Sequence, residues 1–276
     1  MMINLAPNHK MGLPIPNPVM LAAGVVAYGE CVPKGMDTAS LGAVVVGPIT
    51  RYSSGGALDA RMAETVGGAV LNTGGQNRGV SAVVRKMARY WPRLGCPVIA
   101  HIADTLPGPA SGTARRLADV DGLMGLEVAI PRTADEDAAW ELVQAVTRRA
   151  DLPVLAHLPV ERAVWLAEAV VDAGAAALVV GRPALGRLAV GPSLSSGDAA
   201  WVEGDLHGPL AFAPMLAALA GVDRLKLGVP LVAAGGIHTL EQARQSLASG
   251  AVALQIDSAA WIEPGLPGRL VDSLHS

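Results

Sequence analysis

The sequence predicts an α/β fold of the (β/α)8 barrel type on two observations. Eight short apolar or β-branched segments occur along the 276 residues, and most are followed by a longer segment with apolar residues at helical spacing. Strands this apolar have to be covered on both faces, as in a parallel sheet. A doubly wound open sheet has the same alternation, but eight strands in a chain of this length favour a closed barrel. We therefore expect a single domain over residues 1–276.

The expected elements follow one another along the whole chain. The strand segments are Pro18–Val26, Ala43–Ile49, Pro97–Ile102, Gly122–Ile130, Pro153–Leu158, Ala176–Val180, Val229–Ala234 and Ala251–Ile256. The helical segments are Arg78–Trp91, Ala134–Ala150, Val160–Ala173, Gly208–Ala220 and Leu240–Ser249. Several of the helical segments end at Gly or just before Pro, which commonly terminate a helix.

Two long segments interrupt this alternation, Arg51–Asn77 and Arg182–His207. The first is rich in Gly, Ser and Thr, and the second contains several Gly and a Ser-Ser pair. Both follow expected strands, so in a barrel they lie over the C-terminal face, where the βα loops build active sites. We expect them to roof a functional cavity, with mobile surface loops as the alternative.

Composition excludes several classes of protein. With 51% hydrophobic and 16% charged residues, the chain is not disordered. The net charge is −3 and no basic run occurs, so we expect no nucleic-acid partner. Apolar runs are broken before membrane-spanning length and no signal peptide is recognisable, so we expect no membrane segment and a cytoplasmic protein. Cys31 and Cys96 match neither a disulfide framework nor a zinc motif, and we expect no metal site.

Polar residues at several strand ends are candidates for binding a ligand. Gly235-Gly236 ends one strand and Asp257-Ser258 ends the next, so their backbone amides can cradle an anion. Because the loops after strands 7 and 8 of such barrels often bind phosphate, a phosphate-bearing ligand is expected there. His101 and Asp104 follow the third strand, but their spacing is not diagnostic and we interpret them as structural or surface residues. Arg182 is interpreted as a solvated arginine.

The order of several sequence blocks resembles the class 1 dihydroorotate dehydrogenases, which are FMN-binding (β/α)8 barrels. The blocks are Asn17–Gly24 with Tyr28-Gly29, Gly42–Thr50, Glu64–Asn72 leading to Gly75–Gly79, His207–Pro209, Gly235-Gly236 and Gln255–Ala259. The resemblance implies an N-terminal hairpin across the barrel bottom, a homodimer, and in some relatives an iron–sulfur partner subunit for electron transfer.

The resemblance also implies site residues. The cofactor-binding set, for FMN, is Ala22, Ala23, Gly24, His157, His207, Gly208, Gly235, Gly236, Asp257 and Ser258. The substrate-binding set is Asn72, Gln76 and Asn77. In both sets the roles come from the resemblance, and the catalytic residue stays unknown.

The chain departs from the family pattern at the reaction centre. Gly47-Pro48 stands where a Lys is usual, and Gly181 where an Asn is usual. In the segment Glu127–Arg132 the first expected Asn is Ala129, and the position of the catalytic base is deleted. His157 replaces a Lys, either as a partial substitute when protonated or as a neutral histidine that seals a polar gap, and Asp257 replaces the Gly of the last phosphate turn.

These departures leave three functional hypotheses. A positioned general base contributes typically 10²–10⁴-fold to a rate, so its deletion predicts altered or reduced activity. We expect an FMN-dependent oxidoreductase acting on a CH–CH donor other than dihydroorotate. One alternative is a non-catalytic paralogue that keeps a ligand or partner site. The other is a flavin-free barrel that binds a phosphorylated substrate.

Overall fold

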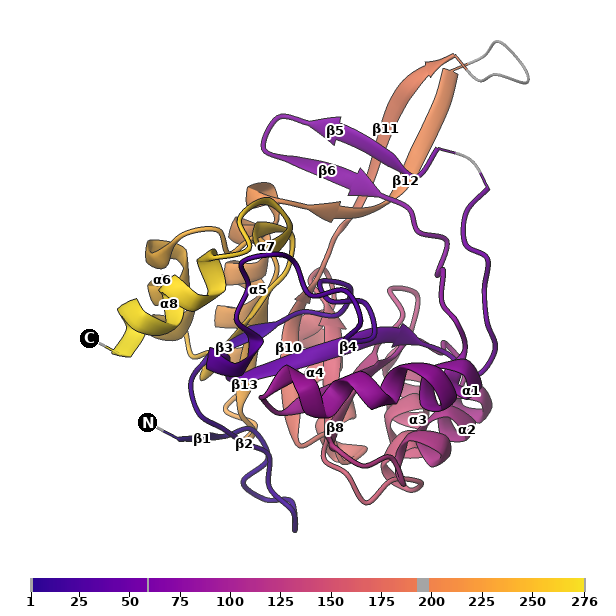
Figure 1. Cartoon of the computed structure of the whole chain (residues 1–276), viewed down its shortest axis with the longest axis vertical. Coiled ribbons are helices and arrows are strands. Elements are labelled where there is room, and N and C mark those ends of the chain that lie inside the picture. The colour runs from indigo at the N-terminus through magenta and orange to yellow at the C-terminus, as the bar shows by residue number, and fades with distance from the viewer. Residues whose placement is uncertain (1, 59, 193–198, 276) are drawn as a thin grey trace.

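The computed structural model describes residues 2–58, 60–192 and 199–275 and shows a closed barrel of eight parallel strands (Figure 1). The barrel strands are β3 (Val19–Leu21), β4 (Ala43–Ile49), β7 (Val98–Ile102), β8 (Leu123–Ala129), β9 (Val154–Pro159), β10 (Ala177–Arg182), β13 (Leu231–Ala234) and β14 (Ala253–Ile256). Each strand pairs with the next in chain order, and β14 pairs with β3 to close the barrel. The predicted fold class and all eight expected strands are confirmed.

Helices follow the barrel strands and cover their outer surface (Figure 1). The longer helices are α2 (Pro107–Leu117), α3 (Glu136–Thr147), α4 (Ala163–Asp172), α5 (Phe212–Asp223), α6 (Leu240–Ala248) and α8 (Leu266–His275). The shorter helical pieces are η1 (Thr38–Ser40), α1 (Val80–Ala82), η2 (Val83–Met87), η3 (Ala88–Leu94), η4 (Pro209–Ala211) and α7 (Ser258–Ile262).

Local sequence explains where these helices begin. Asp135 accepts a hydrogen bond from the amide of Ala138 and so caps α3, and Thr239 caps α6 in the same way. The expected segment Arg78–Trp91 is helical, although its turns change from α to π and then to 3₁₀ geometry. Helix α2 was not predicted, because its first turn carries two prolines and a glycine. Proline is tolerated in a first turn, where the backbone amides have no intrahelical partner.

The barrel interior is filled with apolar side chains at its N-terminal end. A hairpin of β1 (Ile3–Asn4) and β2 (Pro14–Ile15) lies there, as predicted. Its neighbours Leu5 and Leu13 are fully buried against inward-facing strand residues such as Met20. With this end closed by packing, the polar interior positions lie toward the C-terminal ends of the strands.

The two interrupting segments meet in a second sheet that projects from one end of the barrel (Figure 1). It is antiparallel, in the order β11 (Leu185–Pro192), β12 (Ala199–His207), β6 (Gly68–Leu71) and β5 (Met62–Thr65). We call it the cap sheet. Its strands join because Leu71 pairs with Asp205 and Ala69 with His207. The sequence predicted the position of these segments but not their strands.

Candidate functional site

A cavity of 490 Å³ lies between the barrel mouth and the cap sheet, within the size range of small-ligand sites. It is lined from the barrel by Ala23, Gly24, Pro48, His101, Ala129, Arg132 and Arg182, and from the cap segments by residues 71–75, 204, 205 and 207. An adjoining recess of 130 Å³ shares several of these residues and adds Ala22, His157, Gly181, Gly235 and Asp257. Segments that are far apart in sequence therefore enclose one space at the C-terminal end of the barrel.

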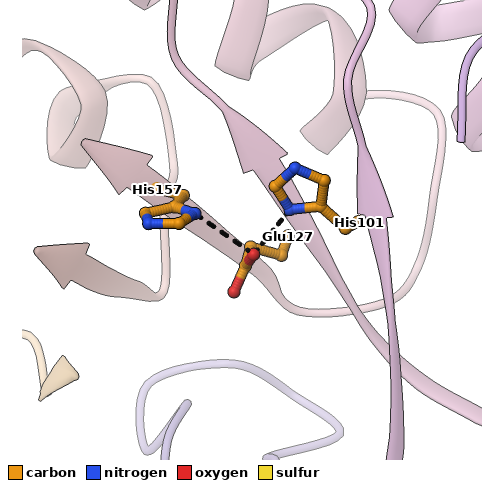
Figure 2. A group of neighbouring side chains, drawn as sticks. All are labelled: His101, Glu127 and His157. Carbon is orange, nitrogen blue, oxygen red and sulfur yellow. Dashed lines mark hydrogen bonds and ion pairs between the residues drawn. The ribbon is translucent and has the colours of Figure 1, made fainter. Parts of the chain in front are cut away.

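A carboxylate with two imidazoles lies in the barrel wall beside this recess (Figure 2). Glu127 on β8 is paired in register with His101 on β7, and its Oε1 lies 2.6 Å from His101 Nδ1. The same oxygen is 3.4 Å from Nδ1 of His157 on β9. The other oxygen, Oε2, accepts a hydrogen bond from Gln255 on β14. Glu127 is completely buried, so these contacts replace its hydration.

The protonation of this cluster follows from its surroundings. Burial, the largest single influence, would raise the pKa of Glu127, but the hydrogen bonds and charge interactions with His101 and His157 together outweigh it and hold that pKa well below the usual range. Burial lowers the pKa of His157, despite the opposite effect of the carboxylate. At neutral pH Glu127 is therefore ionised and His157 is neutral. Of the two interpretations of His157, the neutral histidine agrees with its surroundings.

Two arginines face the cavity from the ends of β8 and β10. Arg132 donates from Nη2 to Asp205 Oδ1 at 2.6 Å and to the carbonyl of Pro183. Arg182 donates from Nη1 to the carbonyl of Ile130 at 2.6 Å. One carboxylate thus faces two guanidinium groups, and Arg132 Nε is buried without a partner among the described residues. Arg182 is not the solvated residue that the sequence suggested, because it lines the cavity.

Asp257 does not present a free negative charge to the recess. Its carboxylate lies 3.3 Å from His207 Nδ1 and accepts a hydrogen bond from Ser258 Oγ at 3.1 Å. Burial, the largest single influence, raises the pKa of Asp257, but the contacts with His207 and the hydrogen bonds from Ser258 together outweigh it, and the pKa falls below its ordinary value. The carboxylate is therefore ionised and partnered, which reduces its repulsion of a bound phosphate.

The residues present fit the flavin mononucleotide that the family resemblance implies. Gly235 has φ +95° and Gly236 has φ +74°, and their amides donate to no residue within the described ranges. Residues with no side chain beyond Cβ are among those that line the cavity and its recess, namely Ala22, Ala23, Ala129 and Gly181. Unpaired amides suit a phosphate, and small lining residues leave room for a planar ring.

The predicted site residues divide into three groups by position. Ala22, Ala23, Gly24, His157, His207, Gly235, Asp257 and Asn72 line the cavity or its recess. Gly208 and Ser258 line a neighbouring pocket of 440 Å³ under the cap sheet. Gly236, Gln76 and Asn77 line none of these spaces.

The residues outside these spaces have other partners. Gln76 accepts a hydrogen bond from Arg61 on the cap. Asn77 is buried, and its side chain accepts from the hydroxyl of Thr50 and from the amide of Gly79. A Cβ on Gly236 would lie 2.2 Å from the amide nitrogen of Phe212, so this glycine permits close packing against α5. Of the predicted substrate residues, the structure brings Asn72 alone to the cavity.

Sequence reasoning passed over Glu127, Arg132 and the role of His101. The available signal was the charged residue within the otherwise apolar strand Leu123–Ala129, since a buried carboxylate requires a partner. Its partners lie on three other strands, and no spacing motif connects them. Within the described part of the chain, no helix is long and apolar enough to cross a membrane.

Comparison with known proteins agrees with this architecture. A "Dihydroorotate dehydrogenase" family profile matches residues 7–276. Similar curated proteins include three called "Dihydroorotate dehydrogenase B (NAD(+)), catalytic subunit". The protein from Pelobacter propionicus is 30% identical over 100% of this chain and 92% of its own length. The protein from Desulforudis audaxviator is 31% identical over 96% of this chain and 89% of its own length. The protein from Geobacter sp. (strain M21) is 29% identical over 96% of this chain and 90% of its own length. Because the matches cover the barrel and both cap segments, this chain belongs to the dihydroorotate dehydrogenase family.

Proposed function

We propose that this protein is an FMN-dependent oxidoreductase that acts on an anionic CH–CH donor other than dihydroorotate. The observation that carries the proposal is the pair Arg132 and Arg182 at the cavity, together with Ala129 and Gly181 where neutral amide side chains are expected. The names of the similar proteins support the reaction class, and the altered cavity supports a different substrate.

FMN would be held by backbone rather than by charged side chains. The amide of Gly235 suits its phosphate, and the small side chains of Ala22 and Ala23 leave room for its ring. When bound, FMN supplies the hydride acceptor of the oxidation. The protein's contribution is to orient the donor from the cap side of the cavity, where Asn72 offers an amide.

The substrate's charge follows from the guanidinium groups. Asp205 forms an ion pair with Arg132, whereas Arg182 donates to the backbone carbonyl of Ile130 and forms no ion pair with a described residue. Guanidinium groups bind carboxylate and phosphate oxygens with charge-assisted hydrogen bonds. The family's site has neutral amide side chains where this chain has arginines nearby. The best match for this cavity is therefore a ligand that carries one more negative group than the family's substrate.

Proton transfer is the weak point of the site. The base position of the family motif is deleted, and the titratable residues that line the 490 Å³ cavity are His101, Asp205 and His207 beside the two arginines. Each of these three has a partner in the structure, Glu127, Arg132 and Asp257 respectively. Slow oxidation of dihydroorotate is the expected consequence.

The test combines cofactor content with a substrate comparison. The purified full chain is expected to show flavin absorbance, and with FMN supplied it should turn over dihydroorotate below about 1 s⁻¹. A panel of anionic CH–CH donors should include one that is oxidised faster. Dihydroorotate turnover above that rate would refute the altered specificity.

Arginine variants test the charge argument directly. Losing a charge-assisted hydrogen bond costs about 1.5–3 kcal/mol, so Arg182→Gln should raise KM for the preferred donor about 10- to 100-fold. Arg61→Gln, on the exposed cap surface, is the matched control and should leave KM unchanged. Equal KM values for the two variants would show that the arginine pair does not bind the substrate.

The non-catalytic paralogue remains the second candidate, because several members of one reaction centre have changed together. Retained flavin with no oxidisable donor would favour it, and a colourless protein that binds phosphorylated compounds would favour the flavin-free barrel. The similar proteins are named catalytic subunits, so we further propose a homodimer that works with an electron-transfer subunit in the cytoplasm. Size-exclusion chromatography of the native protein and co-purification test that assembly.

A further inference from the structure

The buried cluster of His101, Glu127 and His157 contains the donor set of a transition-metal site. One ligand atom from each residue lies within 4.8 Å of the others. The three come from adjacent strands β7, β8 and β9, and Figure 2 shows both imidazoles turned toward the same carboxylate. Strand-borne ligands are held more precisely than loop-borne ones.

One ring nitrogen of His157 lacks the partner that a buried imidazole requires. The exposed fraction of His157 is 9%; Nδ1 lies 3.4 Å from Glu127 Oε1, but Nε2 is buried with no hydrogen bond to any described residue. Buried polar atoms are almost always partnered, and an exception points to an absent water or ion. A neutral imidazole with a free ring nitrogen is the form that ligates metals.

Glu127 also lacks full compensation. Its completely buried carboxylate has His101 and the neutral amide of Gln255 as its hydrogen-bonding partners. In the absence of a metal, the short contact with His101 requires a shared proton. A divalent cation in that position would neutralise the carboxylate and use both imidazoles.

We propose that His101, Glu127 and His157 bind a divalent transition-metal ion of the Zn²⁺ class. Two imidazoles and one carboxylate suit zinc and its neighbours rather than magnesium or calcium, which prefer oxygen ligands. Both histidines line the 130 Å³ recess, so the ion has a route of entry and an open coordination position. No metal site was expected from the sequence, because the three ligands lie on different strands and share no local motif.

The ligand atoms lie within 4.8 Å of one another, so the site has to adjust to reach zinc geometry. Tetrahedral zinc with bonds of about 2.0–2.1 Å places its ligand atoms roughly 3.3 Å apart. The distance from His157 Nδ1 to Glu127 Oε1 is 3.4 Å and needs no change. The contact between His101 and Glu127 is 2.6 Å, so it has to widen as the metal displaces the shared proton. Binding therefore releases a proton and tightens as the pH rises.

The experiment uses the purified full chain, with whatever flavin it carries, after removal of metals by a chelator. Titration with Zn²⁺ is expected to show one saturable site, and Co²⁺ should produce visible absorption bands. His157→Gln should weaken Zn²⁺ binding by at least tenfold. Because the 3.4 Å contact with Glu127 is the only polar contact of the His157 ring with a described residue, and a Gln amide can replace it, the variant is expected to fold. The control His9→Gln changes a histidine at the N-terminal hairpin and should bind as the wild type does.

Unchanged affinity in His157→Gln, or no saturable binding by the wild type, would overturn the proposal. If the variant fails to fold, X-ray absorption of the Zn²⁺-loaded wild type decides. Two imidazoles with one carboxylate support the site, and any other ligand set contradicts it. The proposal rests on barrel strands alone and not on FMN, so a colourless protein that still binds Zn²⁺ would refute the proposed function and leave this site intact.

Discussion

Restoring the family's Asn at position 181 is expected to damage the barrel rather than repair the site. Gly181 has φ +122°, and a Cβ built there would lie 1.8 Å from the carbonyl oxygen of Ala234 and 2.6 Å from Met215 Cγ. The unfavourable φ costs about 1–3 kcal/mol, and displacing the β13 backbone adds about 1–3 kcal/mol. The expected destabilisation of Gly181→Ala is therefore about 2–6 kcal/mol, with Gly181→Asn at least as large.

Thermal unfolding of a matched glycine series measures this. At about 2–3 °C per kcal/mol for a chain of this size, Gly181→Ala should lower Tm by roughly 5–15 °C. Gly35 has a positive φ but open space around it, so Gly35→Ala measures the cost of the backbone conformation alone. This variant should lose about 1–2 kcal/mol of unfolding free energy. Gly108→Ala has open space and no positive φ, and should lose nothing. A Tm of Gly181→Ala within 2 °C of wild type, about the effect of 1 kcal/mol, would refute the reasoning.

Three further outcomes are expected. Burial and the nearby Asp37 raise the pKa of Cys96 to about 12, so at pH 8 a thiol reagent should modify the exposed Cys31 alone in the native protein and both thiols after denaturation. Asn77→Ala should lower the free energy of unfolding by about 1–3 kcal/mol through lost buried hydrogen bonds, while KM for the donor stays unchanged; a raised KM would return Asn77 to the site. Because the pKa of Asp257 is lower in the folded state, its stabilisation is present above its ordinary value of 3.8 and is lost as the pH falls through the folded pKa. Urea unfolding between about pH 5 and 3 should show a steeper loss for wild type than for Asp257→Asn, and equal slopes would contradict this.

The barrel could be predicted because its signal is local. Buried parallel strands have to be apolar along their whole length, and a segment such as Ala43–Ile49 shows this without any tertiary information. The cap strands carry no such signal, since β6 is short and begins with glycine. Its pairing with β12 is decided by where the barrel places the two segments.

The parts of the candidate site formed by backbone or small residues at strand ends could be predicted. The side chains whose role depends on a neighbouring side chain from another strand could not. Gly235 could be assigned to the site from its position after an expected strand, and Ala23 from the family resemblance. The role of Asp257 depends on His207, which reaches it from the end of β12. Likewise Glu127 could not be linked to its histidines, because barrel closure and register bring them together.

The pairing of β6 with β12 also has a consequence for the order of folding. It joins residues near 71 to residues near 205, and closure of the barrel joins residues near 19 to residues near 254. Contacts between distant parts of a chain incur loop-closure entropy before they return any stabilisation, which places both pairings late in folding. The ligand cavity needs the closed barrel mouth as well as the cap sheet, so it comes into existence only when both pairings have formed. Substitutions in the cap pairing would accordingly affect late folding steps and ligand binding together.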